Sequence, residues 1–295
     1  DETPQADRSG LTEADLKFPP PATRSILGKD GLNMLLVPGG DLSISWGDQV
    51  EQSKTVKVQS FFLDETKVTN HHFVEFLNTV KDKLNVENGV VKSNGEIWFY
   101  LGEGTEPYEQ IIYRHDRFHL RDTQYAAHPV VRVTWYGASA YAHHYGKRLP
   151  TEYEWEYAAI QGSSGSVTFS EYQQVTYPPG EEEAASRVGD HIAQMMRMHA
   201  PAEQATLDSS SGQISAGNVF GLKDIGGRVK EWVIRIKDAK RYGSGTASTV
   251  KKPGYQSLVL SISSRSESGL RSFRYPWEGF HDVGFRCALS IGDKG

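Results

Sequence analysis

Only one residue in this chain can do thiol chemistry. Cys287 is the single cysteine among 295 residues, and it lies in the segment Gly284–Ala288 near the C-terminus. A lone thiol can form neither an internal disulfide nor a paired thiolate site for a soft metal such as copper. We therefore expect Cys287 to be a small buried hydrophobe and not a reactive group.

A carboxylate among arginines is the remaining candidate for acid–base chemistry. Glu267 stands in a serine-rich stretch and is flanked by Arg265, Arg271 and Arg274. Such a carboxylate can act as a general base if burial raises its pKa. The alternative is an exposed glutamate that pairs with an arginine. In either case an apolar wall is supplied by Tyr275, Trp277 and Phe280.

The chain contains 10 histidines, which raises the question of a metal site. His71 and His72 are direct neighbours at the start of an expected helix, where adjacent side chains point apart and cannot share a metal. His143 and His144 have the same arrangement. We expect exposed or hydrogen-bonded histidines, with a catalytic transition metal as the alternative.

Composition excludes some classes of partner. The net charge is −5 with both signs interspersed, so the chain has no basic surface typical of nucleic-acid binding. Its hydrophobic content of 38% includes no run long enough to span a bilayer, so no transmembrane segment is expected. The chain begins at Asp1 without an initiator Met. We expect an exported, periplasmic protein that has lost a signal peptide, with a cytoplasmic protein as the alternative.

The chain divides into an arm and one domain. Residues 1–30 are polar and proline-marked, which predicts an extended or disordered N-terminal arm. Residues 31–292 are expected to form a single domain. Within it, residues 161–217 show little periodicity, which is typical of a functional or mobile segment.

Short strands alternate with a few helices along this domain. A strand is expected from Met34 and a second across Val56–Leu63, followed by a helix capped by Thr69. Further helices are expected after Trp135 and after the capping box that begins at Thr151. Hairpin turns are expected at Asn88-Gly89, Asn94-Gly95 and His115-Asp116. With 29 glycines, this pattern predicts an irregular, loop-rich α+β fold.

Blocks of sequence in a characteristic order resemble the formylglycine-generating enzyme (sulfatase-modifying factor) family. The blocks are Met34–Gly40, Lys67–Asn70, His128–Trp135, Gly146–Ala159, Asn218–Trp232, Arg271, Pro276 and Gly284–Cys287. They span most of the expected domain. The resemblance implies an irregular α+β fold related to C-type lectins. It also implies an ancestor that oxidised a substrate cysteine with a copper-binding pair of cysteines.

The cysteine pair of that family is missing here. An ungapped alignment of the last block places the pair on Leu258 and Ser263, and a family serine that handles oxygen on Tyr255. A leucine cannot be a thiolate ligand, and a serine hydroxyl is a poor copper ligand. We therefore expect no copper and no formylglycine formation.

The resemblance also implies one structural calcium ion. In the family, a carboxylate or amide, two backbone carbonyls and a glutamate hold it. The matching positions here are Asp224, Gly227, Val229 and Glu231. Calcium prefers such hard oxygen ligands. The alternative is an acid that caps a turn without a metal.

Two functions are compatible with these features. The first is a non-catalytic recognition or accessory module that binds a protein or small ligand in the former cleft, through Tyr255, Ser263, Arg265, Glu267 and Trp277. The second is a cysteine-independent oxidative maturation enzyme of the periplasm, resembling the pyoverdine-maturation members. Leu258 and Tyr255 favour binding, whereas Glu267 favours catalysis.

Overall fold

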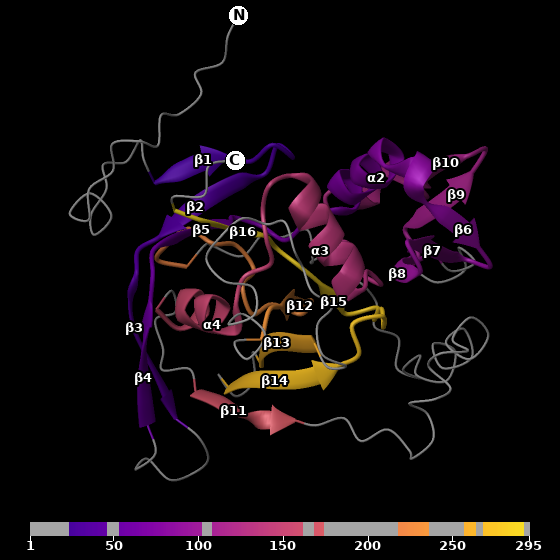
Figure 1. Ribbon diagram of the computed structural model, residues 1–295. Helices are drawn as coiled ribbons and strands as arrows, with labels where there is room; N and C mark the ends of the chain where they lie inside the picture. The colour runs from indigo at the N-terminus through magenta and orange to yellow at the C-terminus, as the bar shows by residue number, and fades with distance from the viewer. Residues whose placement is uncertain are drawn as a thin grey trace, which may run out of the picture.

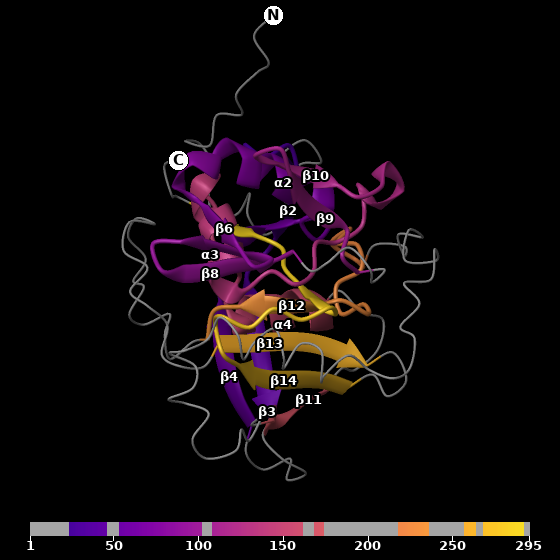
Figure 2. The same ribbon diagram turned by 90° about the vertical axis from the view of Figure 1, so that its right-hand side faces the viewer.

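A computed structural model describes residues 24–45, 53–101, 108–161, 168–173, 218–235, 257–263 and 268–291. Figures 1 and 2 show a five-stranded sheet at one end of the molecule and helix α2 with the β9–β10 hairpin at the other. The described residues form the helices α2 (Asn70–Thr79), α3 (Trp135–His144) and α4 (Glu152–Gln161). Short 3-10 turns occupy Lys81–Lys83 and Thr123–Tyr125. The described part is therefore an α+β fold rich in short strands, as predicted.

A four-stranded sheet pairs strands from the N-terminal part of the domain with a strand near its C-terminus. Its order is β1-β2-β5-β16, and its strands are β1 (Ser25–Leu27), β2 (Asn33–Val37), β5 (Phe61–Asp64) and β16 (Ala288–Ser290). Ile26 of β1 is paired with Met34, and its side chain packs against the apolar cluster formed by Met34, Leu36, Phe62 and Leu289. The structure describes residues 24–30 of the predicted arm, in which β1 is an extended strand at the edge of this sheet; the boundary between arm and domain stays a prediction. The local sequence of these residues is polar, but the pairing of β1 with β2 satisfies the backbone.

The five-stranded sheet carries the segment expected to line the cleft. Its order is β11-β14-β13-β12-β15, and its strands are β11 (Thr168–Gln173), β12 (Lys230–Val233), β13 (Ser257–Ser263), β14 (Ser268–Arg274) and β15 (Val283–Gly284). Helix α4 packs on it through Trp155 and Ala159, which contact Val233, Leu260 and Phe273.

Hairpins make up most of the remaining strands. They are β3 (Gly40–Ser45) with β4 (Ser53–Val58), β6 (Asn85–Glu87) with β7 (Val90–Ser93) and β8 (Glu96–Tyr100), and β9 (Ile111–Arg114) with β10 (Arg117–Leu120). Asn88, Asn94, His115 and Asp116 all have positive φ, which confirms the three predicted turns. The single strand expected across Val56–Leu63 is instead β4 and β5, because the chain changes sheets between them.

Helices α2 and α4 have the caps that the sequence predicts, and α3 is capped by Thr134. Thr69 accepts a hydrogen bond from the His72 N–H, and Thr134 accepts one from the Gly137 N–H. The capping box at α4 is also present, because Glu154 Oε2 accepts from the Thr151 N–H at 2.8 Å. These caps fix where each helix starts relative to the core.

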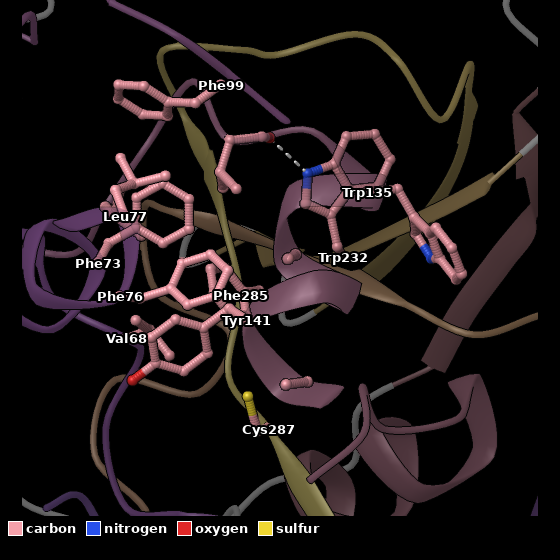
Figure 3. Packing of buried hydrophobic residues seen from close by; sticks show 14 of the residues in the cluster. Val68, Phe73, Phe76, Leu77, Phe99, Trp135, Tyr141, Trp232, Phe285 and Cys287 are labelled. Atoms are coloured by element: carbon pink, nitrogen blue, oxygen red, sulfur yellow. Dashed lines mark hydrogen bonds between the residues drawn. The ribbon is translucent and has the colours of Figure 1, made fainter. Parts of the chain in front are cut away.

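The largest apolar cluster holds together α2, α3 and residues Gly284–Ala288, which we call the closing segment (Figure 3). Phe73 and Phe76 of α2 contact Tyr141 of α3, and Phe285 packs edge-on against Tyr141 with ring centroids 5.4 Å apart. Cys287 is fully buried in the same cluster, as predicted. Within the described ranges, no helix is long and apolar enough to cross a membrane.

A buried ion cluster ties the four-stranded sheet to α3. Lys147 Nζ donates to both carboxylate oxygens of Asp30 at 2.6 and 2.7 Å, and to Asp64 Oδ1 at 2.8 Å. The Tyr141 hydroxyl also donates to Asp30, at 2.8 Å. One ammonium thus serves two buried carboxylates. Burial is the largest effect and, against the lowering influence of Lys147, raises the pKa of Asp64 to about 6.

This pKa predicts an unusual loss of stability toward neutral pH. The folded state favours protonated Asp64 more than the unfolded chain does, since the usual pKa is 3.8. The contribution is present below about pH 4 and is lost as pH rises through about 6. Urea unfolding between pH 4 and 7.5 should show this fall for the wild type and a flatter profile for Asp64→Asn. Glu87→Gln, which removes one exposed carboxylate, is the control. Equal slopes for the wild type and Asp64→Asn would show that Asp64 is not perturbed.

Candidate functional site

Only some of the predicted site residues are described by the structure. Tyr255, Arg265 and Glu267 lie outside the described residues, so binding or catalysis through them stays a prediction. Leu258 and Ser263 both lie in β13, where their backbones pair with Phe273 and Ser268. Five residues of extended strand separate two positions by roughly 17 Å. These two positions therefore cannot form a closely spaced ligand pair.

Cys287 is not available for nucleophilic or redox chemistry. Its side chain is fully buried, and its backbone N–H donates to Asp64 Oδ2 at 2.8 Å. Burial and the neighbouring Asp64 carboxylate raise the pKa of the Cys287 thiol well above its usual value. The thiolate, which is the reactive form, is therefore strongly disfavoured.

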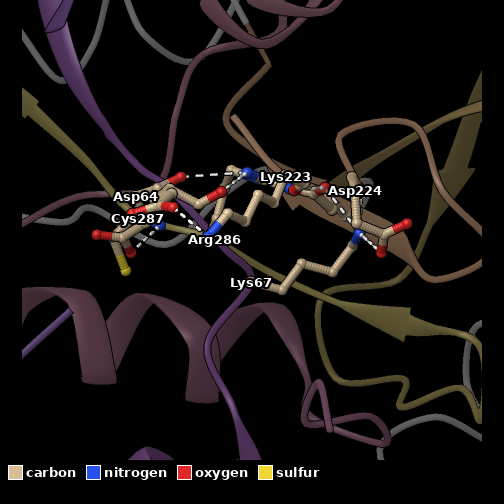
Figure 4. Close-up of polar contacts among 8 residues, drawn as sticks. Asp64, Lys67, Lys223, Asp224, Arg286 and Cys287 are labelled. Carbon is tan, nitrogen blue, oxygen red and sulfur yellow. Dashed lines mark hydrogen bonds and ion pairs between the residues drawn. The ribbon is translucent and has the colours of Figure 1, made fainter. Parts of the chain in front are cut away.

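A buried ion pair connects the closing segment to β12 (Figure 4). Arg286 Nε donates to Glu231 Oε2 at 2.7 Å, and Arg286 Nη2 donates to Glu231 Oε1 at 3.0 Å. Both side chains are completely inaccessible to solvent. Burial by itself raises the pKa of Glu231, but Arg286 and Lys67 outweigh it and hold that pKa below its usual value. Glu231 is therefore an ionised, fully paired carboxylate.

The two acidic side chains among the expected calcium ligands, Asp224 and Glu231, have other partners. Lys67 Nζ donates to the Asp224 carbonyl oxygen and, at 2.7 Å, to Asp224 Oδ2. The same ammonium is 3.4 Å from Glu231 Oε1. Figure 4 shows Lys67 reaching Asp224 directly. The side chains at this turn therefore do not fit a calcium ion, because a lysine ammonium lies among the oxygens that were expected to hold it.

Arg271 forms a buried ion pair with Glu156. Its Nε and Nη2 donate to the two carboxylate oxygens of Glu156 at 2.6 and 2.7 Å. Both side chains are buried. This pair fixes α4 to β14, which is the strand that leads into the aromatic wall.

Three aromatic residues expected to form an apolar wall follow β14, and we call Tyr275, Trp277 and Phe280 the aromatic platform. That they line a cleft stays a prediction. The rings of Tyr275 and Trp277 are stacked with centroids 4.7 Å apart and planes within 9°. All three side chains are half-buried. The guanidinium of Arg274 lies 5.4 Å from the centre of the Phe280 ring. The platform therefore presents aromatic surface and a positive charge together.

Hydrogen bonds fix the backbone beneath the platform. The Tyr100 hydroxyl donates to the Trp277 carbonyl at 2.8 Å, and Glu278 Oε2 accepts from the Tyr275 N–H at 2.9 Å. The Glu278 N–H donates in turn to the Tyr275 carbonyl at 3.1 Å. These bonds close a tight turn, so Tyr275 and Trp277 are held in place before any ligand arrives.

Arg132, a residue with a strained backbone, is hydrogen-bonded to the backbone of the platform. Arg132 has a φ of 65°, in the left-handed region that non-glycine residues rarely adopt. Its N–H donates to the Phe280 carbonyl at 2.8 Å, and its side chain forms a buried ion pair with Glu109 at 2.7 Å. A Cβ on Gly279 would lie 2.5 Å from the Arg132 carbonyl oxygen, so only glycine fits there. Such strain often accompanies functional sites.

Lys67 and Arg132 differ in how far the sequence indicates a role for them. Lys67 carried a visible signal, since it begins a block that resembles the family. Arg132 carried none, because arginine does not indicate a left-handed backbone. Within the described residues, no group of three or more His, Cys, Asp or Glu side chains is arranged to hold a metal.

Comparison with known proteins gives one family. The Sulfatase-modifying factor enzyme 1-like domain family matches residues 25–291. The formylglycine-generating enzyme of Streptomyces coelicolor is 30% identical over 263 residues, covering 79% of this chain and 79% of that protein.

Two further similarities are more limited. The serine/threonine-protein kinase pkn1 of Chlamydia pneumoniae is 34% identical over 203 residues, which cover 68% of this chain but only 27% of the kinase. This chain thus spans about a quarter of that relative. The structure of PvdO from Pseudomonas aeruginosa has 17% identity and a TM-score of 0.45, over 89% of this chain and 95% of PvdO. The family match covers the whole described fold, and the chain therefore belongs to the sulfatase-modifying factor family of formylglycine-generating-enzyme-like domains.

Proposed function

We propose that this chain is a recognition or accessory domain that binds a protein or a small ligand at the aromatic platform, without formylglycine-generating activity. The observation that carries the proposal is the preorganised stack of Tyr275 and Trp277, half-exposed and fixed by the bond from Tyr100. That the chain is exported to the periplasm stays a prediction from the sequence.

The thiol content supports the loss of the ancestral chemistry. The one cysteine is buried, and its pKa is raised well above the usual value. The two positions aligned with the family pair lie along one strand. This chain lacks the pair of thiols that oxidation of a peptide cysteine by paired thiolates requires.

The platform has the properties of a binding surface. Aromatic side chains dominate the energetics of many interfaces, because a large area is buried with few rotatable bonds. A surface that is already ordered also loses less conformational entropy on binding. Arg274 adds a cation whose hydrogen-bond donors can recognise carboxylates, amides or hydroxyls. These features support recognition at this surface more directly than catalysis.

Formylglycine formation is the first activity to test. Incubation with a Cys-x-Pro-x-Arg peptide and copper should leave the peptide unchanged by mass spectrometry. The physical reason is the absence of an accessible thiol in this chain. Conversion of the cysteine to an aldehyde would contradict the proposal and would show that the aligned register of β13 is wrong.

The platform itself is tested by Trp277→Ala. Immobilised chain should capture a stoichiometric component from an extract of its host, and Trp277→Ala should reduce that capture by about tenfold or more. Leu27→Ala is the control, since Leu27 is an exposed apolar residue on β1, at 72% exposure. Equal capture by both variants, with unchanged melting temperatures, would contradict binding at the platform. A chemically altered small molecule in the bound fraction would favour the enzyme instead.

A further inference from the structure

We propose that the ammonium of Lys67 is a built-in replacement for a metal ion at the turn Asp224–Glu231, so that this turn is independent of calcium. The inference is separate from the function proposed above. It follows from the disagreement between the expected ligands and their observed partners.

Lys67 contacts both acidic side chains that were expected to hold a metal. Its side chain is 1% exposed, and it reaches Asp224 through both the carbonyl and the carboxylate. Glu231 Oε1 lies 3.4 Å away on the same ammonium. Three oxygens around one ammonium match its three hydrogen-bond donors. The positive charge at this turn is thus supplied by the chain itself.

A metal ion in addition to Lys67 would be unfavourable at this place. Glu231 is already held by Nε and Nη2 of Arg286. A divalent ion beside Glu231 would lie next to two positive charges, Lys67 and Arg286, whose side chains are buried. The local balance of charge is complete without a metal.

The backbone of the turn is folded around this contact. Asp224 has a φ of 51°, which directs the chain sharply at the point where Lys67 binds it. A Cβ on Gly227 would lie 1.8 Å from Asp224 Oδ1, so the carboxylate occupies the space that a side chain would need. Gly227 therefore makes room for a carboxylate that is bound to lysine.

Calcium content separates the proposal from the family expectation. Wild type and Asp224→Gly, each dialysed against 1 mM calcium chloride, should contain the same molar amount of calcium by elemental analysis. Glycine removes the side-chain oxygens and adopts the left-handed backbone readily, and the Asp224 side chain is 45% exposed, so this variant should fold. Loss of one calcium per chain in Asp224→Gly would overturn the proposal, whatever other sites the chain has.

Removing the ammonium should create a demand for a cation. Lys67→Met is expected to melt at a lower temperature than the wild type, and calcium should raise its melting temperature by about 3 °C relative to chelator. The wild type and the control Lys230→Met, which loses a half-exposed pair with Asp282, should show no such difference. A calcium-dependent rise in the wild type that Asp224→Gly removes would overturn the proposal. So would a Lys67→Met variant with wild-type stability. If Lys67→Met does not fold, the calcium content of the wild type and Asp224→Gly decides.

Discussion

The buried pair between Glu231 and Arg286 is the interaction on which the rest of the arrangement depends. Arg286 also donates to the carbonyl oxygens of Asp64 and Lys223, so one guanidinium connects β5, the turn before β12 and the closing segment. Both charges are removed from water. Such a pair adds little net stability by itself, but loss of one partner leaves a buried charge and costs about 3–5 kcal/mol. The pair therefore fixes the positions of these segments, because separating the two side chains would leave each charge buried without its partner.

The same pair positions the proposed binding surface. Glu231 lies in β12, which pairs in parallel with β15 at Gly284. The platform precedes β15 by a few residues and is held at its other end by β14, which Arg271 fixes to α4. Ion pairs within the chain thus hold β12, β14, α4 and the closing segment together. Lys67 and Lys147 act in the same way, each neutralising acids that burial would otherwise destabilise.

Local features were predictable from the sequence, and long-range pairings were not. The caps at Thr69 and Thr151 and the turns at Asn88 and Asn94 depend on residues a few positions apart, so the sequence predicts them. The strand β1 depends on a partner in β2, and Arg271 on a partner 115 residues away. For the site, Tyr275 and Trp277 stack on one another and are only two positions apart in the sequence, but their role in lining a cleft stays a prediction. Whether Glu267 has any role stays a prediction.

A double-mutant cycle on Glu231→Gln and Arg286→Met, measured by urea unfolding in the presence of chelator, tests the central claim most directly. Each single change leaves one buried charge without its main partner, whereas the double change removes both charges of the pair. The destabilisation of the double variant should be smaller than the sum of the two single effects by about 2 kcal/mol or more. Effects that add to within about 0.5 kcal/mol would contradict the claim that this pair holds the structure together.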